Sequence, residues 1–235
     1  MRSRSNVVPR SLFEGSEGRP DSTILMKEWS SCQKCAALCG NRKQVVFWDA
    51  QQPKAEILVV GQWPGRDENK MGFPFLGKAG KLCREMISKP DEAAGFLLGK
   101  EQFAWANALG CRVPDDVPFH MDYLDNCHPL LEAEIKLLQP ACILALGRVA
   151  FLRLSGRRTL RTGESTNGQR GSYKGIPVFF MDHPARLYRL VNSLERQKFQ
   201  ELVEKTLHEF KTWHKELRKH EPREAAEGGA GAAEA

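Results

Sequence analysis

The segment EILVVGQWPGRDENKMGFPFLGKAG, residues 56–80, decides the fold of this chain. Residues 56–60 form a short, mostly apolar run that stops at Gly61, which predicts a buried strand with a loop at its carboxyl end. In a parallel α/β sheet, ligands bind at that end of the strands. The loop 61–65 contains two glycines and one proline, so its backbone can turn sharply and bring amide groups close to a ligand.

A second glycine-flanked segment, residues 72–77, precedes a helix predicted over residues 78–87. Its two aromatic rings, Phe73 and Phe75, lie outside any regular apolar stripe. One interpretation is a hydrophobic plug over the sheet, and the other is a ring that stacks on a flat ligand. The spacing alone leaves both open.

Length and composition predict one α/β domain with a core of ordinary size. The chain has 235 residues, 41% of them hydrophobic, a formal net charge of +6 and an isoelectric point near 9.0. This moderate positive charge suits a polyanionic partner. No run is long enough to span a membrane, and the first 20 residues lack the apolar stretch of a secretory signal. We therefore expect a cytoplasmic monomer with no membrane partner.

Four apolar runs, each followed by a helical pattern, predict the architecture. They are residues 56–60, 103–109, 141–146 and 177–181. This alternation implies a three-layer α/β/α fold with a central, mainly parallel four-stranded sheet. Helices are expected at residues 25–29, 130–138 and 192–219. Residues 23–217 would form the domain, with disordered polar segments at 1–22 and 218–235.

Loops at the carboxyl ends of three of these strands carry the candidate site residues. They would bring together Gln62, Trp63, Phe75, Asn107 and His183. A further loop, residues 157–170, is basic and polar, and ends at Arg170. It is either a contact for a phosphate backbone or an ordinary solvated loop.

The seven cysteines are more plausible as metal ligands and buried thiols than as disulfides in a cytoplasmic protein. Cys32 and Cys35 form a CxxC pair, in which one turn can present both thiolates to a metal. Cys39 follows closely. Cys83 and Cys142 lie among apolar residues and are expected in the core.

The ordered motifs resemble those of the family 4 uracil-DNA glycosylases, the iron–sulfur branch of their superfamily. The resemblance covers about residues 31–189. Its most specific part is GFPFLGKAG, residues 72–80, which is similar to the family's G-R-P-F-V-G-K/R-A-G. The other motifs are the CxxC pair, the variant loop GQWPG at 61–65, ANALGCR at 106–112 and HPARLYR at 183–189.

The resemblance implies a structural 4Fe-4S cluster. The positions that match the family's thiolate ligands are Cys32, Cys35, Cys111 and Cys127. By composition alone, four soft ligands could hold zinc equally well. The cluster would fix the amino-terminal segment to the loop after the second predicted strand.

The resemblance also implies the chemistry of a DNA glycosylase, with DNA containing uracil or a modified base as the partner. Phe75 would stack on a flipped base, and Asn107 would read its edge. His183 and the backbone amides around Gln62 would stabilise the negative charge that develops on the leaving base. Arg186 and Arg170 would contact phosphates, and Leu187 would fill the vacated stack.

One motif departs from the family. The loop reads Gly61-Gln62-Trp63-Pro64-Gly65, without the carboxylate expected to orient the attacking water. Asp67, Glu68 and Asp182 are the candidate replacements. Asp182, beside His183, is the preferred one, and Asp67 and Glu68 are more plausible as solvated or capping carboxylates.

Trp63 would reshape the pocket wall, which leaves the choice of base open. The main hypothesis is a monofunctional DNA glycosylase. The alternatives are a glycosylase for hypermodified pyrimidines of the phage type, acting in defence, and a catalytically weak protein that binds damaged DNA. A nucleoside hydrolase is disfavoured by the basic loop, and covalent trapping of the base by the lack of a histidine between Leu154 and Lys174.

Overall fold

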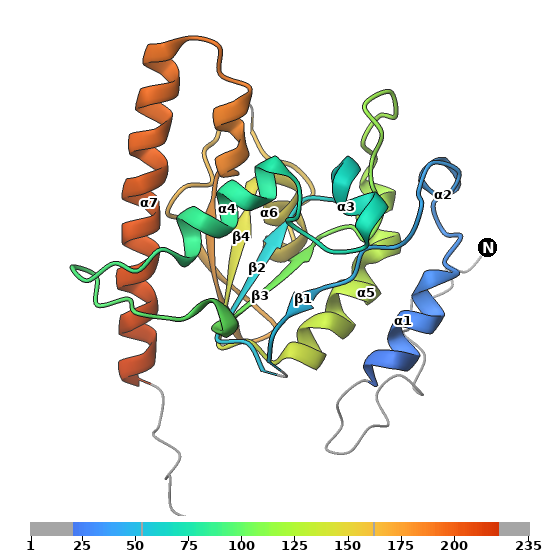
Figure 1. Cartoon of the computed structure of the whole chain (residues 1–235), viewed down its shortest axis with the longest axis horizontal. Helices are drawn as coiled ribbons and strands as arrows, with labels where there is room; N and C mark the ends of the chain where they lie inside the picture. Colours follow the sequence, from blue (N-terminus) through green and yellow to red (C-terminus); the bar gives the residue numbers. More distant parts are fainter. Residues whose placement is uncertain (1–20, 53, 162, 221–235) are drawn as a thin grey trace, which may run out of the picture.

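The computed structural model describes residues 21–52, 54–161 and 163–220. Within these ranges the chain forms one α/β/α sandwich around a mixed sheet (Figure 1). The strands are β1 (Asp49–Ala50), β2 (Ile57–Gly61), β3 (Phe103–Asn107), β4 (Cys142–Leu146), β5 (Arg170–Tyr173) and β6 (Ile176–Met181). The helices are α1 (Ser22–Ser30), α2 (Ala36–Cys39), α3 (Arg66–Met71), α4 (Lys78–Ser88), α5 (Met121–Leu138), α6 (Gly147–Ser155) and α7 (Ser193–His220), with 3-10 turns η3 (Lys100–Gln102) and η4 (Pro184–Tyr188).

The strand order is β1-β3-β2-β4-β6-β5. The four inner strands are mutually parallel and correspond to the four predicted runs, so the predicted parallel sheet is confirmed. The two outer strands pair antiparallel to their neighbours and were not predicted. They are short and lie at the edges, where few buried apolar residues mark a strand in the sequence.

Both faces of the inner strands are buried, and this explains their unbroken apolar sequence. In β2, Ile57 and Val59 pack on the face covered by α4 and α7, whereas Leu58 and Val60 pack on the face covered by α5 and α6 (Figure 1). All four side chains are fully buried. Each contributes roughly 1.5–3 kcal/mol to folding.

The start of helix α5 differs from the predicted one. The sequence analysis predicted a helix over residues 130–138, but the helix begins at Met121 and contains Pro129. The proline removes one backbone hydrogen bond of the helix. Tyr123 and Leu124, buried in the first turns, hold that part against the sheet and offset the loss. Cys127 is therefore a helical residue.

The expected disordered segments, 1–22 and 218–235, lie almost entirely outside the described residues. Where they are described, Ser22 begins α1 with Asp21 as its cap, and α7 continues to His220. No helix in the described part of the chain combines the length and the apolar character needed to cross a membrane.

Candidate functional site

The candidate site lies where β2, β3 and β6 end at the same edge of the sheet. Gly61, the last residue of β2, is directly paired with Asn107, the last residue of β3. A β-carbon at Gly61 would lie 2.7 Å from Oδ1 of Asn107 and 2.7 Å from Cζ of Phe75. Only glycine leaves room for both side chains at this point. The first two of the converging loops therefore meet over Gly61.

Backbone hydrogen bonds join these loops. The amides of Ala108 and Leu109 donate to the carbonyls of Gly61 and Gln62, at 3.0 and 3.1 Å. The side chain of Gln62 extends toward Gly147, the residue directly after β4. A β-carbon at Gly147 would lie 2.7 Å from Nε2 of Gln62 and 3.1 Å from Cβ of His183. Gly147 also has a φ of +80°, a conformation that favours glycine. Gln62 and His183 thus flank the same glycine.

Phe75 is held in an unusual conformation. It has a φ of +56°, its ring packs 5.1 Å from that of Trp105, and only 4% of the residue is exposed. Arg84 fixes the backbone here, with Nε donating to the carbonyl of Phe75 at 3.2 Å and Nη2 to the carbonyl of Pro74 at 3.0 Å. The surrounding contacts offset the strain of the positive φ.

The surroundings of His183 favour a neutral imidazole that can donate a hydrogen bond. Its Nδ1 accepts a hydrogen bond from the Ala185 amide at 3.2 Å and lies 3.8 Å from Sγ of Cys83. Burial, helped by the charge of Arg189, lowers the pKa of His183 to about 4. Burial also raises the pKa of Cys83 to about 12, so its thiol keeps a proton that can point at Nδ1. With Nδ1 accepting, the ring proton resides on Nε2.

Asp182 is occupied by a different part of the chain. Its Oδ1 accepts hydrogen bonds from the amide and hydroxyl of Thr166, at 3.3 and 2.9 Å, and its Oδ2 accepts one from Asn167 Nδ2 at 3.3 Å. The carboxylate therefore ties the loop before β5 to the end of β6. This geometry favours a structural role for Asp182 over the water-activating role that the sequence analysis preferred.

Glu68 is another carboxylate in the wall of the cavity, which also includes Asp67 and Asp182. It lies in the first turn of α3, is 7% exposed, and its Oε1 accepts a hydrogen bond from the Gly77 amide at 2.8 Å. The sequence analysis favoured a capping or solvated role for Glu68, and it predicted no helix over residues 66–71. The signal for a short helix was present in Gly65 and Gly72, which flank it.

These residues line one cavity of about 470 Å³. Of the predicted residues, its wall includes Gln62, Trp63, Phe75, Asn107, Asp182, His183 and Arg186. Trp63 is held by its stack on Phe119, with ring centroids 5.6 Å apart and planes at 25°. The cavity is large enough for a nucleobase, and one of its walls is a fixed indole.

Basic side chains outnumber acidic ones in the lining of the cavity, where Asp67, Glu68 and Asp182 are the acidic residues. Its lining also includes Arg66, Lys78, Arg148 and Arg189. Arg66 pairs with Asp115 at 2.8 Å, and Lys78 lies over the ring of Tyr188 at 4.7 Å.

Two predicted DNA contacts are not part of this rim. Leu187 is 6% exposed and packs in the core between the sheet, α4 and α7, so as placed it cannot act as a protruding wedge. Its neighbour Tyr188 is 42% exposed. Arg170 lies on the outer strand β5, over the ring of Phe179, and does not line the cavity.

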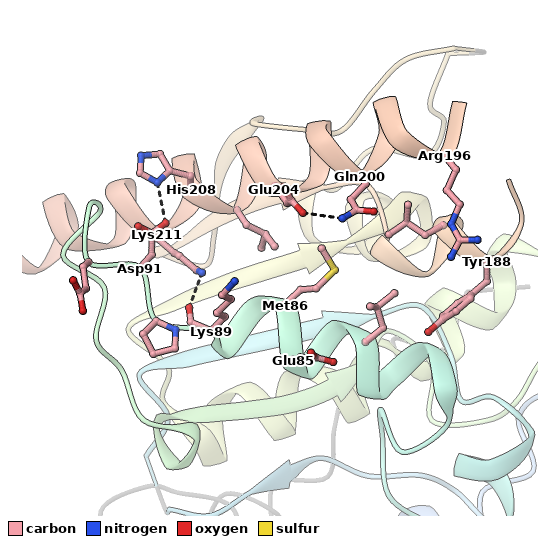
Figure 2. Close-up of a pocket in the computed structure, with 15 residues that line it drawn as sticks. Glu85, Met86, Lys89, Asp91, Tyr188, Arg196, Gln200, Glu204, His208 and Lys211 are labelled. Carbon is pink, nitrogen blue, oxygen red and sulfur yellow. Dashed lines mark hydrogen bonds and ion pairs between the residues drawn. The ribbon is translucent and has the colours of Figure 1, made fainter. Parts of the chain in front are cut away.

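A larger hollow, of about 640 Å³, lies between α4 and α7 (Figure 2). Leu187 is the one predicted site residue in its wall. Its polar groups bond to one another: His208 to Asp91 at 2.8 Å, Lys211 Nζ to the Lys89 carbonyl at 2.7 Å, and Gln200 to Glu204 at 3.0 Å (Figure 2). We therefore place the chemistry in the smaller cavity.

The cysteines fall into two groups. Cys83 and Cys142 are fully buried in the core, as predicted. The other five, Cys32, Cys35, Cys39, Cys111 and Cys127, line a single pocket. Within the described ranges, no three Cys, His, Asp or Glu side chains stand close enough together to hold one metal ion.

Several N–H groups in this pocket point at sulfur. Arg42 Nη1 donates to Cys111 Sγ at 3.5 Å, Asn126 Nδ2 to Cys35 Sγ at 3.5 Å, and the Gly110 amide to Cys127 Sγ at 3.2 Å. Such donors stabilise thiolate ligands. The side chains of Trp29, Leu38 and Leu109 close the pocket with apolar surface.

Comparison with known proteins agrees with this geometry. The family model described as "Uracil DNA glycosylase superfamily" matches residues 48–227. The type-4 uracil-DNA glycosylase of Sulfurisphaera tokodaii is 34% identical over 167 residues, which cover 68% of this chain and 73% of that protein. The type-4 enzyme of Thermotoga maritima is 30% identical over 77% of this chain and 91% of its own length. That of Pyrobaculum aerophilum is 31% identical, with 68% and 80% covered. The chain therefore belongs to the uracil DNA glycosylase superfamily, in which these relatives form the type 4 branch.

Proposed function

We propose that the protein is a monofunctional DNA glycosylase that flips uracil, or another modified base, out of DNA and hydrolyses its N-glycosidic bond, leaving an abasic site. The observation that carries this proposal is the single cavity lined by Phe75, Asn107 and His183. The names of the type 4 relatives support uracil as the base.

A flipped base would be held by its face and its edge. Phe75 provides a ring at the cavity wall, in a conformation fixed by Arg84 and Trp105. Asn107, at the end of β3, offers both a donor and an acceptor to the pyrimidine edge. Both side chains approach Gly61, so the face and the edge of one base can be contacted together.

The leaving base would be stabilised by His183. Cleavage leaves negative charge on the base, and a neutral imidazole with its proton on Nε2 can donate a hydrogen bond to that charge. The Ala185 amide fixes this tautomer through Nδ1. Burial keeps the ring neutral at pH 7, because it lowers the pKa of His183 to about 4.

Glu68 is our candidate for orienting the attacking water. It lines the cavity, and its Oε1 is held by the Gly77 amide at the start of α4. Gln62 lines the same wall and can hold a water without removing its proton. This assignment replaces Asp182, whose two oxygens bond to Thr166 and Asn167.

The DNA backbone would lie along the basic rim of the cavity. Lys78, Arg148, Arg186 and Arg189 come from three separate elements or their ends and line the same cavity. Neutralising several phosphates in this way makes affinity depend strongly on salt concentration.

The five-thiol pocket supports a structural 4Fe-4S cluster held by Cys32, Cys35, Cys111 and Cys127. Four thiolates can also bind one zinc ion, and the metal content of the purified protein distinguishes the two groups. Thiolate ligation would join the amino-terminal segment to α5 and to the loop after β3. Brown protein with broad visible absorbance, lost in Cys111→Ala, is the expected result, and colourless protein containing zinc would contradict it.

Excision is tested with end-labelled oligonucleotides that contain one uracil, opposite guanine, opposite adenine or in a single strand. We expect strand breaks only after alkali treatment, because a monofunctional glycosylase leaves the sugar-phosphate backbone intact. An otherwise identical oligonucleotide with cytosine in place of uracil is the control. No breaks with any uracil substrate would reject uracil excision.

The loop 61–65 favours a second candidate, excision of a hypermodified pyrimidine or binding of damaged DNA with weak catalysis. Gln62 stands where the resembling family has a carboxylate, and Trp63 is fixed against Phe119. Oligonucleotides carrying hypoxanthine or hypermodified pyrimidines separate these options. Breaks on those bases alone would indicate altered base choice, whereas specific binding without breaks on any substrate would indicate a binding protein.

A further inference from the structure

The pocket that contains the four proposed cluster ligands contains a fifth thiol, that of Cys39. A 4Fe-4S cluster takes four cysteine thiolates from its protein. Cys39 is therefore one more than the cluster needs, and it matches none of the ligand positions in the resembling family.

Cys39 lies one helical turn after Cys35. Cys35 is the N-cap of α2 and Cys39 is the last residue of that helix, and the Cys39 amide donates to the Cys35 carbonyl at 2.9 Å. Side chains four residues apart lie on the same face of a helix. Both thiols consequently face the same pocket.

Arg42 brings Cys39 close to a second ligand. Its Nη1 lies 3.4 Å from Sγ of Cys39 and 3.5 Å from Sγ of Cys111, so one nitrogen donates to both sulfurs. Its Nη2 donates to the carbonyl of Cys32 at 2.5 Å, and the Cys39 thiol points at that same carbonyl at 3.5 Å. The guanidinium of Arg42 thus contacts Cys39, Cys32 and Cys111 together.

We propose that Cys39 is a reserve ligand of the iron–sulfur site, able to replace Cys35. The inference rests on the proposed cluster. In the exchange, Cys39 loses its proton to water as its sulfur bonds to iron, the bond from Cys35 breaks, and the Cys35 thiolate takes up a proton. No electron is transferred. The replacement requires movement along one turn of α2, whereas Cys127 lies on α5 and cannot be replaced by such a shift.

The test measures iron and acid-labile sulfide per chain in the parent protein and in four variants. The parent and Cys39→Ala are expected to hold a full cluster. Cys35→Ala is expected to keep most of the parent's iron, because Cys39 supplies the fourth thiolate. Cys35→Ala/Cys39→Ala and the control Cys127→Ala are expected to lose it. If Cys35→Ala loses as much iron as the double variant, the reserve role is overturned. A colourless parent would overturn the cluster itself, and the reserve role with it.

Two further measurements test the same role, and the second of them does not use Cys35→Ala. Alkylation followed by mass spectrometry should label Cys39 in the folded parent and protect it in Cys35→Ala, and equal labelling would contradict the proposal. In the second, peroxide should release iron faster from Cys39→Ala than from the parent, because an oxidised Cys35 then has no replacement. Equal release rates would likewise overturn it.

Discussion

The ring of Phe75 lies nearly parallel to the imidazole of His183, with an angle of 10° between the planes and 6.4 Å between the centroids. Phe75 precedes α4, whereas His183 follows β6, which is separated from β2 by β4 in the sheet. The fold therefore aligns two flat groups from distant parts of the chain in one cavity wall. A nucleobase bound between the loops would meet surfaces that already share an orientation.

Replacing His183 with alanine should lower uracil excision by about 100- to 1000-fold, the usual cost of losing one donor to a developing charge. DNA affinity should change little, because the ring faces the cavity and the rim charges remain. Single-turnover excision and fluorescence anisotropy with uracil-containing DNA measure the two effects. Equal excision rates in variant and parent would remove His183 from the mechanism.

The pH dependence of excision should reflect the lowered pKa of His183, about 4 in the folded protein against 6.5 for an ordinary histidine. The neutral ring is the active form, so the contribution of His183 should be constant from about pH 8 to 5 and fall toward pH 4. The unfolded chain binds the proton more readily, so the stability contributed by the neutral ring is complete above pH 6.5 and is lost as the pH falls through about 4. Denaturation at several pH values, parent against His183→Gln, isolates this group.

Gly61→Ala should damage activity more than stability. The added β-carbon would come within 2.7 Å of both Asn107 Oδ1 and Phe75 Cζ, and either side chain must shift to make room. A displacement of about 1 Å at a reacting site costs roughly 100-fold in rate. Gly40→Ala is the matched control, because its nearest neighbour atom would be 3.9 Å from the new β-carbon and its φ is −66°. Similar loss of activity in both variants would argue against the contact at Gly61.

Glu68→Gln and Asp182→Asn should behave differently. If Glu68 orients the water, Glu68→Gln should lower excision by about 100- to 10,000-fold with little change in melting temperature, since an amide oxygen can still accept from the Gly77 amide. Asp182→Asn weakens acceptors used by Thr166 and Asn167, so it should lower the melting temperature first. Thermal melts and excision rates of the two variants distinguish the roles. The reverse pattern would restore Asp182 as the base.

The sheet and the location of the site were predictable because they follow from burial. Runs such as 57–60 and 142–146 are apolar on both faces, and this marks inner parallel strands whose carboxyl ends share an edge. Gln62, Asn107 and His183 come at or just after such ends, so their convergence followed from strand order alone.

Side-chain orientation was not predictable in the same way. Leu187 lies between the exposed Arg186 and Tyr188, but the 3-10 turn η4 rotates it into the core. The partners of Asp182 come from residues 166 and 167, before β5, and no local pattern links them to it. Glu68 depends on the short helix α3. In each case the orientation or role of the side chain depends on contacts that form only in the folded chain.

Arg84 should control activity through the backbone of Phe75. Its guanidinium donates to the carbonyls of Pro74 and Phe75, pairs with Asp49 at 2.5 Å and lies 4.6 Å from the centre of the Trp105 ring. In Arg84→Lys one flexible ammonium group replaces the planar guanidinium whose Nε and Nη2 hold the two carbonyls in a fixed geometry, so the positive φ of Phe75 loses support. We expect a lower excision rate, measured as kcat, with a smaller change in KM.

Asp49→Asn is the control, because it removes the charge of the ion pair and leaves the carbonyl contacts in place. Since both partners of this pair are about one-third exposed, its loss should affect stability only slightly. Equal loss of excision in the two variants would show that the ion pair, and not the support of Phe75, is what the site requires.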